Sequence, residues 1–106
     1  MNNALKLVLT THDDLFAARE LAQMAVEARL VACVNIIPGL VSVFRWQGEI
    51  QTEDEVLLIC KTTEELLPQL KELIIDQHSY SVPELIELDG GVFNEIYMDW
   101  INDCLK

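Results

Sequence analysis

An α+β fold is predicted by two features of the chain: helical and strand-like apolar patterns alternate along it, and one strand-like run is unusually long. The predicted order is β-α-β-β-α-β, followed by one last helix. This order is typical of the ferredoxin-like pattern, a four-stranded antiparallel sheet with its helices on one face. The length of 106 residues suits one domain. We therefore expect a single domain over residues 1–106, with a long β-hairpin arm and a short C-terminal helix.

The first strand and the first helix follow directly from local patterns. Residues 4–11 are rich in Leu, Val and Thr and predict a strand. Residues 13–30 predict a helix, because apolar residues recur there at steps of three and four. Thr11, followed three residues later by Asp14, resembles a weak capping box at the helix start. The apolar face is mostly alanine, so we expect this helix to lie close against the sheet.

The long strand-like run is the first half of a predicted hairpin. Residues 31–46 and 50–61 predict two strands that turn at Gln47 and Gly48. Gly48 can adopt the positive φ that a two-residue turn requires. A straight strand of the first of these lengths would span about 50 Å, whereas a compact chain of this size has a radius of gyration of about 13 Å. The hairpin must therefore bend or project from the body.

The predicted turn also fixes how the two strands of the hairpin face each other. It places Trp46 opposite Glu49. Pro38 and Gly39 interrupt the first strand, and Pro38 has no amide hydrogen for a strand ladder. We expect a bend or a β-bulge at these two residues.

The second half of the chain supplies the remaining elements. Residues 62–77 predict a second helix, whose first turn is expected to be offset or kinked by Pro68. Residues 82–88 predict a fourth strand that starts near Pro83. Apolar and aromatic residues between 93 and 100 predict the short terminal helix.

The predicted arm is apolar on both faces, although helices cover only one face of a sheet of this kind. A lone chain would leave an apolar patch and a free strand edge in water, which soluble proteins avoid. We therefore expect a homo-oligomer of closed symmetry, in which each arm packs on a neighbour's sheet. The residues concerned near the arm are Leu40, Val41, Val43, Phe44 and Trp46.

Charge and cysteine content limit the partners and the compartment. The chain has 18 Asp and Glu against 7 Lys and Arg, a net charge of −11. Nucleic acid and anionic membrane surfaces would be repelled, so neither is an expected partner. No signal peptide is expected, and the apolar runs fall short of the ~20 residues of a membrane span. Without a C-x-x-C pair, Cys33, Cys60 and Cys104 predict free thiols in a reducing cytoplasm.

Four stretches, "ACVNIIPGLVSVFRWQGEI", "EVLLICKT", "HSYSVPELI" and "NEIYMDWI", resemble the CutA family of divalent-cation tolerance proteins. The resemblance covers nearly the whole chain, in order and without large gaps. It implies a ferredoxin-like trimer of PII-like architecture, with interlocked hairpin arms and clefts between subunits. It further implies a cytoplasmic, non-enzymatic protein that responds to divalent metal ions, copper among them.

His78 is the candidate metal ligand, with Tyr80 and Glu84 nearby in sequence. An imidazole suits Cu²⁺ or Zn²⁺, but one histidine supplies one ligand, and a structural or surface histidine remains the alternative. The sequence also departs from the family pattern. Ser79 and Ser81 replace a proline and a glutamate, and some relatives carry a cysteine and a second histidine where this chain has Thr10 and Gln77. Metal binding is therefore expected to be weak or peripheral.

A second hypothesis makes the chain a PII-like regulatory module that binds a small molecule in a cleft between subunits. Lys61, Tyr80 and Glu84 are the candidate residues for that cleft. Lys61 follows a buried strand, where a bound anion or a neighbour's carboxylate would meet its ammonium group. The sequence lacks G-x-S-x-G, H-E-x-x-H, P-loop and G-x-G-x-x-G motifs, so an enzyme is not expected.

Overall fold

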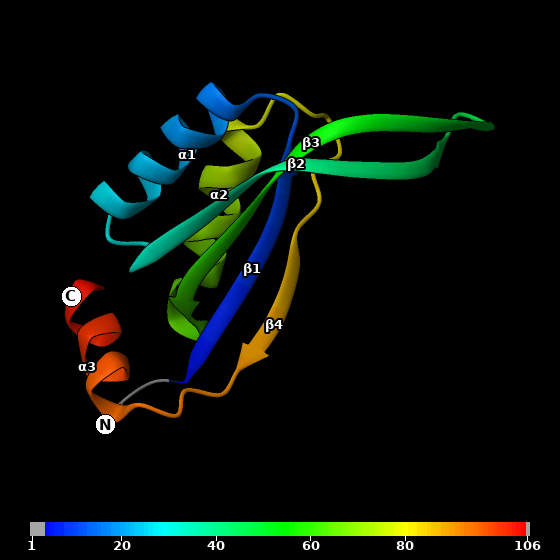
Figure 1. The fold of residues 1–106 in the computed structure, drawn as a ribbon. Helices are drawn as coiled ribbons and strands as arrows, with labels where there is room; N and C mark the ends of the chain where they lie inside the picture. The colour runs from blue at the N-terminus through cyan, green and yellow to red at the C-terminus, as the bar shows by residue number, and fades with distance from the viewer. Residues whose placement is uncertain (1–3, 106) are drawn as a thin grey trace.

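The computed structural model describes residues 4–105 and forms one antiparallel sheet with three α-helices (Figure 1). The strand order is β2-β3-β1-β4. The predicted α+β class, the four-stranded antiparallel sheet and the order of the elements are confirmed. The elements are β1 (Leu5–His12), α1 (Leu15–Glu27), β2 (Cys33–Trp46), β3 (Glu49–Thr63), α2 (Leu67–Gln77), β4 (Ile86–Gly90) and α3 (Glu95–Cys104). No helix in this part of the chain is long and apolar enough to cross a bilayer.

The hairpin of β2 and β3 has the predicted turn and pairing. Trp46 lies opposite Glu49, as predicted. Gln47 and Gly48 have φ angles of 51° and 83°. Positive φ at both turn residues gives the backbone a twist that matches the right-handed twist of the flanking strands.

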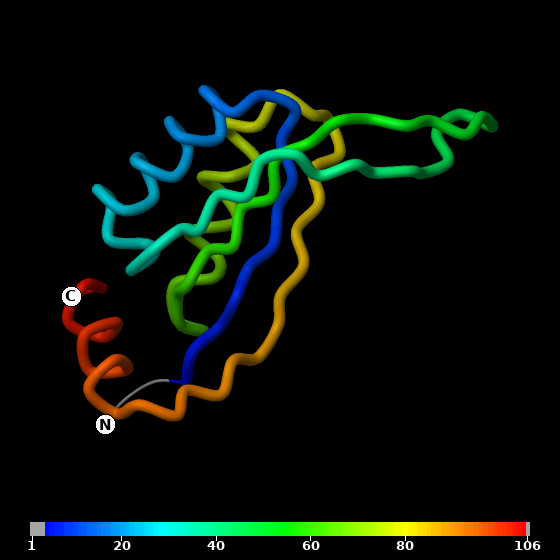
Figure 2. Tube along the Cα trace, in the orientation of Figure 1, coloured from blue at the N-terminus to red at the C-terminus, as the bar shows by residue number. Residues whose placement is uncertain are grey.

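The outer part of this hairpin projects from the body as an arm (Figures 1 and 2). The chain measures 48 × 25 × 22 Å along its principal axes. The ladder shifts register between Ile37 and Leu40, on either side of Pro38 and Gly39, and Gly39 has φ of 80°. The predicted bulge is therefore confirmed, and it lies where the arm leaves the sheet.

Two separate apolar clusters cover opposite faces of the sheet. Val8 belongs to the larger cluster, which α1 and α2 cover. Leu5 is buried with Ile101 of α3, and Leu7 packs against the same group. Successive side chains of a strand point to opposite faces, so Leu7 and Val8 mark the two sides of β1. The expectation of helices on one face is thus incomplete, because α3 covers one end of the other face.

The boundaries of several elements differ from the sequence expectation, among them the starts of α1 and β4. Thr11 does not form a capping box, because it is a buried residue of β1. Asp14 alone caps α1, and its carboxylate accepts a hydrogen bond from the amide of Ala17 at 3.2 Å. Strand β4 begins at Ile86 rather than at 82, so Pro83 lies in the preceding connection.

The second helix accommodates its proline by starting late. A 3₁₀ turn, Glu64–Leu66, precedes α2, and Pro68 is the second residue of the α-helix. At that position its missing amide hydrogen removes no intrahelical bond. The expected offset of the first turn is therefore present.

Candidate functional site at the base of the arm

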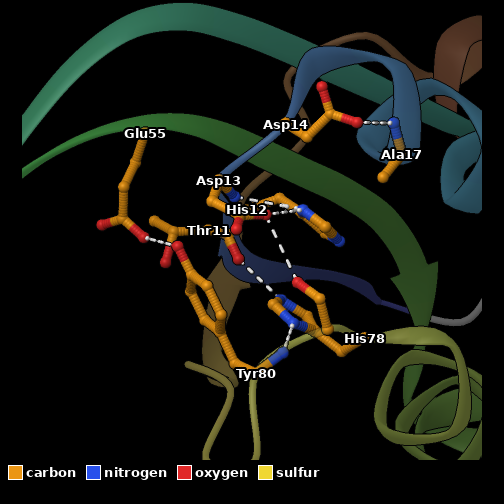
Figure 3. A network of polar contacts seen from close by, with 9 residues as sticks. Thr11, His12, Asp13, Asp14, Ala17, Glu55, His78 and Tyr80 are labelled. Atoms are coloured by element: carbon orange, nitrogen blue, oxygen red, sulfur yellow. Dashed lines mark hydrogen bonds and ion pairs between the residues drawn. The ribbon is translucent and has the colours of Figure 1, made fainter.

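The connection between α2 and β4, residues 78–85, crosses the end of β1 beside the base of the arm (Figure 1). It is held there by polar contacts to three different segments (Figure 3). His78 contacts β1, Ser79 contacts Asp13 after that strand, and Tyr80 contacts Glu55 on β3. These contacts tie residues 78–85 both to β1 in the body and to β3 at the base of the arm.

Both ring nitrogens of His78 are engaged. Its Nε2 lies 2.7 Å from the carbonyl oxygen of Thr11, and its Nδ1 accepts the amide of Tyr80 at 3.0 Å. A carbonyl only accepts, so the proton sits on Nε2 and the imidazole is neutral. Burial lowers the pKa of His78; the Thr11 carbonyl opposes this shift and the neighbouring His12 adds to it.

The His78 ring is the middle member of an aromatic stack. The ring centroids of His12 and His78 are 4.4 Å apart, and those of His78 and Tyr80 are 4.7 Å apart. His12 is 1% exposed, and its Nδ1 accepts the amide of Asp13 at 3.1 Å. Its Nε2 is buried without a hydrogen-bond partner among the described residues. His12 therefore serves as a buried platform for the other two rings.

In the sequence, His12 stands directly before Asp13 and Asp14, between the predicted strand and the predicted helix, and nothing there gives it a specific role. The structure instead makes it the last residue of β1. The signal was the strand alternation: Val8, Thr10 and His12 share one face, and Val8 faces the core. A histidine that continues a buried alternation is expected to lie inside.

Glu55 is the second residue that the sequence did not single out. It is only 8% exposed, and the Tyr80 hydroxyl donates to its carboxylate at 2.6 Å. Burial, followed by this contact, raises the pKa of Tyr80. Burial and the charge of Glu55 also raise the pKa of Glu84. His78, Tyr80, Glu84 and Glu55 thus form one acidic site at the arm base.

Lys61 lies apart from this site within the chain. It is at the far end of β3, opposite Leu7 on one side and Cys33 on the other. Its ammonium group donates to the Tyr97 hydroxyl at 3.2 Å and lies 5.7 Å from the centroid of that ring. Of the predicted cleft residues, Tyr80 binds Glu55 and the charge of the same carboxylate acts on Glu84, whereas Lys61 contacts Tyr97.

The donor set for a metal ion is sparse. Across residues 4–105 no group of three or more His, Cys, Asp or Glu side chains is arranged to hold an ion. At His78, only Nδ1 can become a ligand, because Nε2–H donates to Thr11, an arrangement typical of metal-binding histidines. The Tyr80 amide must then leave Nδ1. The assignment of His78 as a ligand stays a prediction.

A family model described as CutA1 divalent ion tolerance protein matches residues 6–104. The chain belongs to the CutA family. A CutA relative from Thermus thermophilus, the "Divalent-cation tolerance protein CutA", is 45% identical over 98 residues, covering 92% of this chain and 95% of the relative. The recognition of the family from four sequence stretches is therefore confirmed.

Plant CutA proteins resemble this chain both in sequence and in fold. The "Protein CutA, chloroplastic" of Arabidopsis thaliana is 39% identical over 100 residues, which are 94% of this chain and 55% of that protein. The crystal structure of CutA1 from Oryza sativa has a TM-score of 0.95 at 38% identity, covering 99% of this chain and 96% of that one. The CutA fold therefore accounts for the sheet, the helices and the arm together.

Proposed function

We propose that this chain is a homotrimeric, non-enzymatic divalent-cation tolerance protein that responds to metal ions such as copper in the cytoplasm. Membership of the CutA family supports the link to divalent cations. The three free cysteines are consistent with a reducing compartment. The observation that carries the assembly is the exposed apolar surface of the arm.

The arm is apolar where a lone chain would meet water. Val41, Val43 and Ile50 are 60%, 67% and 69% exposed. On β4, Ile86 and Leu88 are also exposed. Burying such side chains is worth about 1.5–3 kcal/mol each. A neighbouring copy's arm packed on the sheet would remove both surfaces from water, and closed symmetry with three subunits follows the CutA resemblance.

The metal response is assigned to the arm base, with Nδ1 of His78 as the coordinating atom. Thr11 holds the opposite nitrogen of the ring and so fixes its orientation. The carboxylates of Glu55 and Glu84 lie in the same site and favour a cation there. Since the Tyr80 amide must be displaced, binding is weak, as expected for a site with one imidazole ligand.

A copper titration tests this assignment. Cu²⁺ is added to the wild type, to His78→Ala and to the matched control Gln77→Ala, whose residue is exposed and adjacent. Calorimetry gives the affinity, and electron paramagnetic resonance reports nitrogen coordination. We expect His78→Ala to lose the nitrogen signal and about tenfold in affinity, with Gln77→Ala unchanged. Equal affinities of all three proteins would remove His78 from the metal response.

A second function is favoured by Lys61. This residue is half-buried, and its ammonium group has no carboxylate within ion-pair distance among residues 4–105. The same chain would then be a PII-like regulatory module whose small-molecule ligand binds between subunits. One ligand can meet Lys61 together with Tyr80 and Glu84 only if two copies contribute, because these residues lie apart in one chain. A thermal-shift screen of metals and metabolites separates the two functions, since a ligand of the native state raises its stability with the logarithm of concentration.

A further inference from the structure

Lys61 and Tyr97 are hydrogen-bonded to each other, and no carboxylate among residues 4–105 lies within ion-pair distance of Lys61. Lys61 is half-buried on the sheet face that α3 partly covers, and its cross-strand neighbours Leu7 and Cys33 offer no carboxylate. Its ammonium group uses one of three N–H bonds on the Tyr97 oxygen. The O–H of Tyr97 remains available to donate, because that oxygen is the acceptor in this contact.

The surroundings of this pair are unusual for so acidic a chain. There are 18 acidic residues against 7 basic ones. Lys6, in contrast, has three carboxylates within ion-pair distance, those of Glu64, Glu87 and Asp89. Lys61 has no such carboxylate among the described residues, although burying a charge costs free energy unless the charge is paired. The pair is therefore an incomplete ionic site.

We propose that Lys61 and Tyr97 form a carboxylate-binding site, with the ammonium group and the phenol O–H donating to the two oxygens of one carboxylate. The two donor atoms are 3.2 Å apart, close enough to serve the two oxygens of one group. Carboxylate fits better than phosphate, because a higher negative charge would be repelled more strongly by a chain of net charge −11.

An aromatic surface adjoins the two donors. The rings of Tyr97 and Trp100 are stacked, with centroids 5.6 Å apart, and Trp100 is 45% exposed. A planar group attached to the carboxylate can stack on this ring. The carboxylate comes either from a free aromatic acid or from an acidic side chain of a second copy. In the first case the site supplies the ligand class of the regulatory function proposed above and rests on it.

The test uses benzoate as the probe and benzamide as its uncharged control. Nuclear magnetic resonance follows the Trp100 indole, which is distinguished from Trp46 with the Trp46→Phe variant. Sedimentation of the same samples measures assembly. The variants are Lys61→Met, Lys61→Arg and Tyr97→Phe, with Lys71→Met, at an exposed position on α2, as the matched control.

A free acid is indicated if benzoate, but not benzamide, gives a saturable shift that Lys61→Met weakens about tenfold or more. Tyr97→Phe should weaken it less, and Lys61→Arg and Lys71→Met should retain it. A second copy is indicated if benzoate gives no saturable shift but Lys61→Met weakens self-association about tenfold, with Lys71→Met unchanged.

The proposal is overturned if benzoate does not bind saturably and assembly is the same in Lys61→Met and Lys71→Met. Should Lys61→Met fail to fold, Tyr97→Phe decides by the same two readouts, since it keeps the ring and removes only the donor. The outcome is independent of copper binding at His78, because His78 contacts β1 at Thr11, whereas Lys61 lies opposite Leu7, nearer the other end of that strand.

Discussion

The arm and the body use the same two strands, β2 and β3, in opposite ways. In the body, Leu58 and Cys60 of β3 are 0% and 3% exposed beneath the helices. In the arm, Val43 on β2 is 67% exposed, and it pairs only with Thr52 across the ladder. The fold of one chain therefore buries the apolar residues of the body, whereas it leaves those of the arm exposed.

The junction between these two regions is held by polar contacts rather than by apolar packing. The bulge at Pro38 and Gly39 ends the body part of β2, and Glu55 lies opposite Leu40 just beyond it. Tyr80 binds Glu55 from a connection that His78 fixes to β1. The arm base is thus tied to the body by hydrogen bonds that can be removed one at a time.

Substitution in the body should have the largest effect. Leu58→Ala creates a cavity under both helices and should lower the free energy of unfolding by about 2–5 kcal/mol. Chemical denaturation at several protein concentrations measures this loss. The loss should be the same at all concentrations low enough for the chains to be dissociated. The matched change in the arm, Val43→Ala, should lower the free energy of unfolding only at concentrations where the chains are assembled. A similar loss for both variants in dilute solution would erase the distinction between body and arm.

A charge in the arm should act on assembly rather than on folding. Val43→Lys places an ammonium group on the surface that a neighbour is expected to cover, so the dissociation constant should rise about a hundredfold, or ~2.7 kcal/mol. Analytical ultracentrifugation measures it, with Gln69→Lys on the exposed surface of α2 as the control. Far-ultraviolet circular dichroism should be unchanged in both. If Val43→Lys sediments as the wild type does, the arm is not the contact between copies.

At the junction, removing one hydroxyl should have an intermediate effect. Tyr80→Phe leaves the buried carboxylate of Glu55 without its donor, which should cost about 1–3 kcal/mol of stability. Urea denaturation measures the cost, and amide exchange should rise on both sides of Glu55. Glu53→Gln, at an exposed arm position, serves as the control and should have little effect. Unchanged exchange in Tyr80→Phe would mean that this contact does not tie the arm to the body.

Features set by neighbouring residues could be predicted from the sequence. The turn at Gly48 and the bulge at Gly39 are examples, because positive φ at a hairpin turn or a bulge favours glycine. Once the turn was placed, the pairing of Trp46 with Glu49 followed from geometry alone. His78, Tyr80 and Glu84 could be proposed as a set because they are close in sequence, and their role stays a prediction.

Features that depend on distant segments could not be predicted. Glu55 belongs to a run of acidic residues that resembles a solvated edge, and only the connection carrying Tyr80 buries it. Lys61 was grouped with Tyr80 in an expected cleft between subunits, whereas within the chain its side chain contacts Tyr97 of α3. The position of α3 on the second face of the sheet decides this, and a helix periodicity does not say which face a helix covers.

The smallest expected effect is an alkaline loss of stability that originates in the body. Burial raises the pKa of the Cys60 thiol to about 12, with a smaller contribution from the charge of Cys33. The unfolded thiol ionises near its ordinary pKa of about 8.5, so above that pH the unfolded chain has lost the proton that the folded chain retains. Stability should therefore be full below about pH 8 and fall by at most ~1.4 kcal/mol per pH unit above about pH 9. Urea denaturation between pH 7 and pH 10 measures the slope, and Cys60→Ala should reduce it without reducing the slope caused by other groups. Equal slopes in the two proteins would show that the thiol ionises as readily in the folded body as in the unfolded chain.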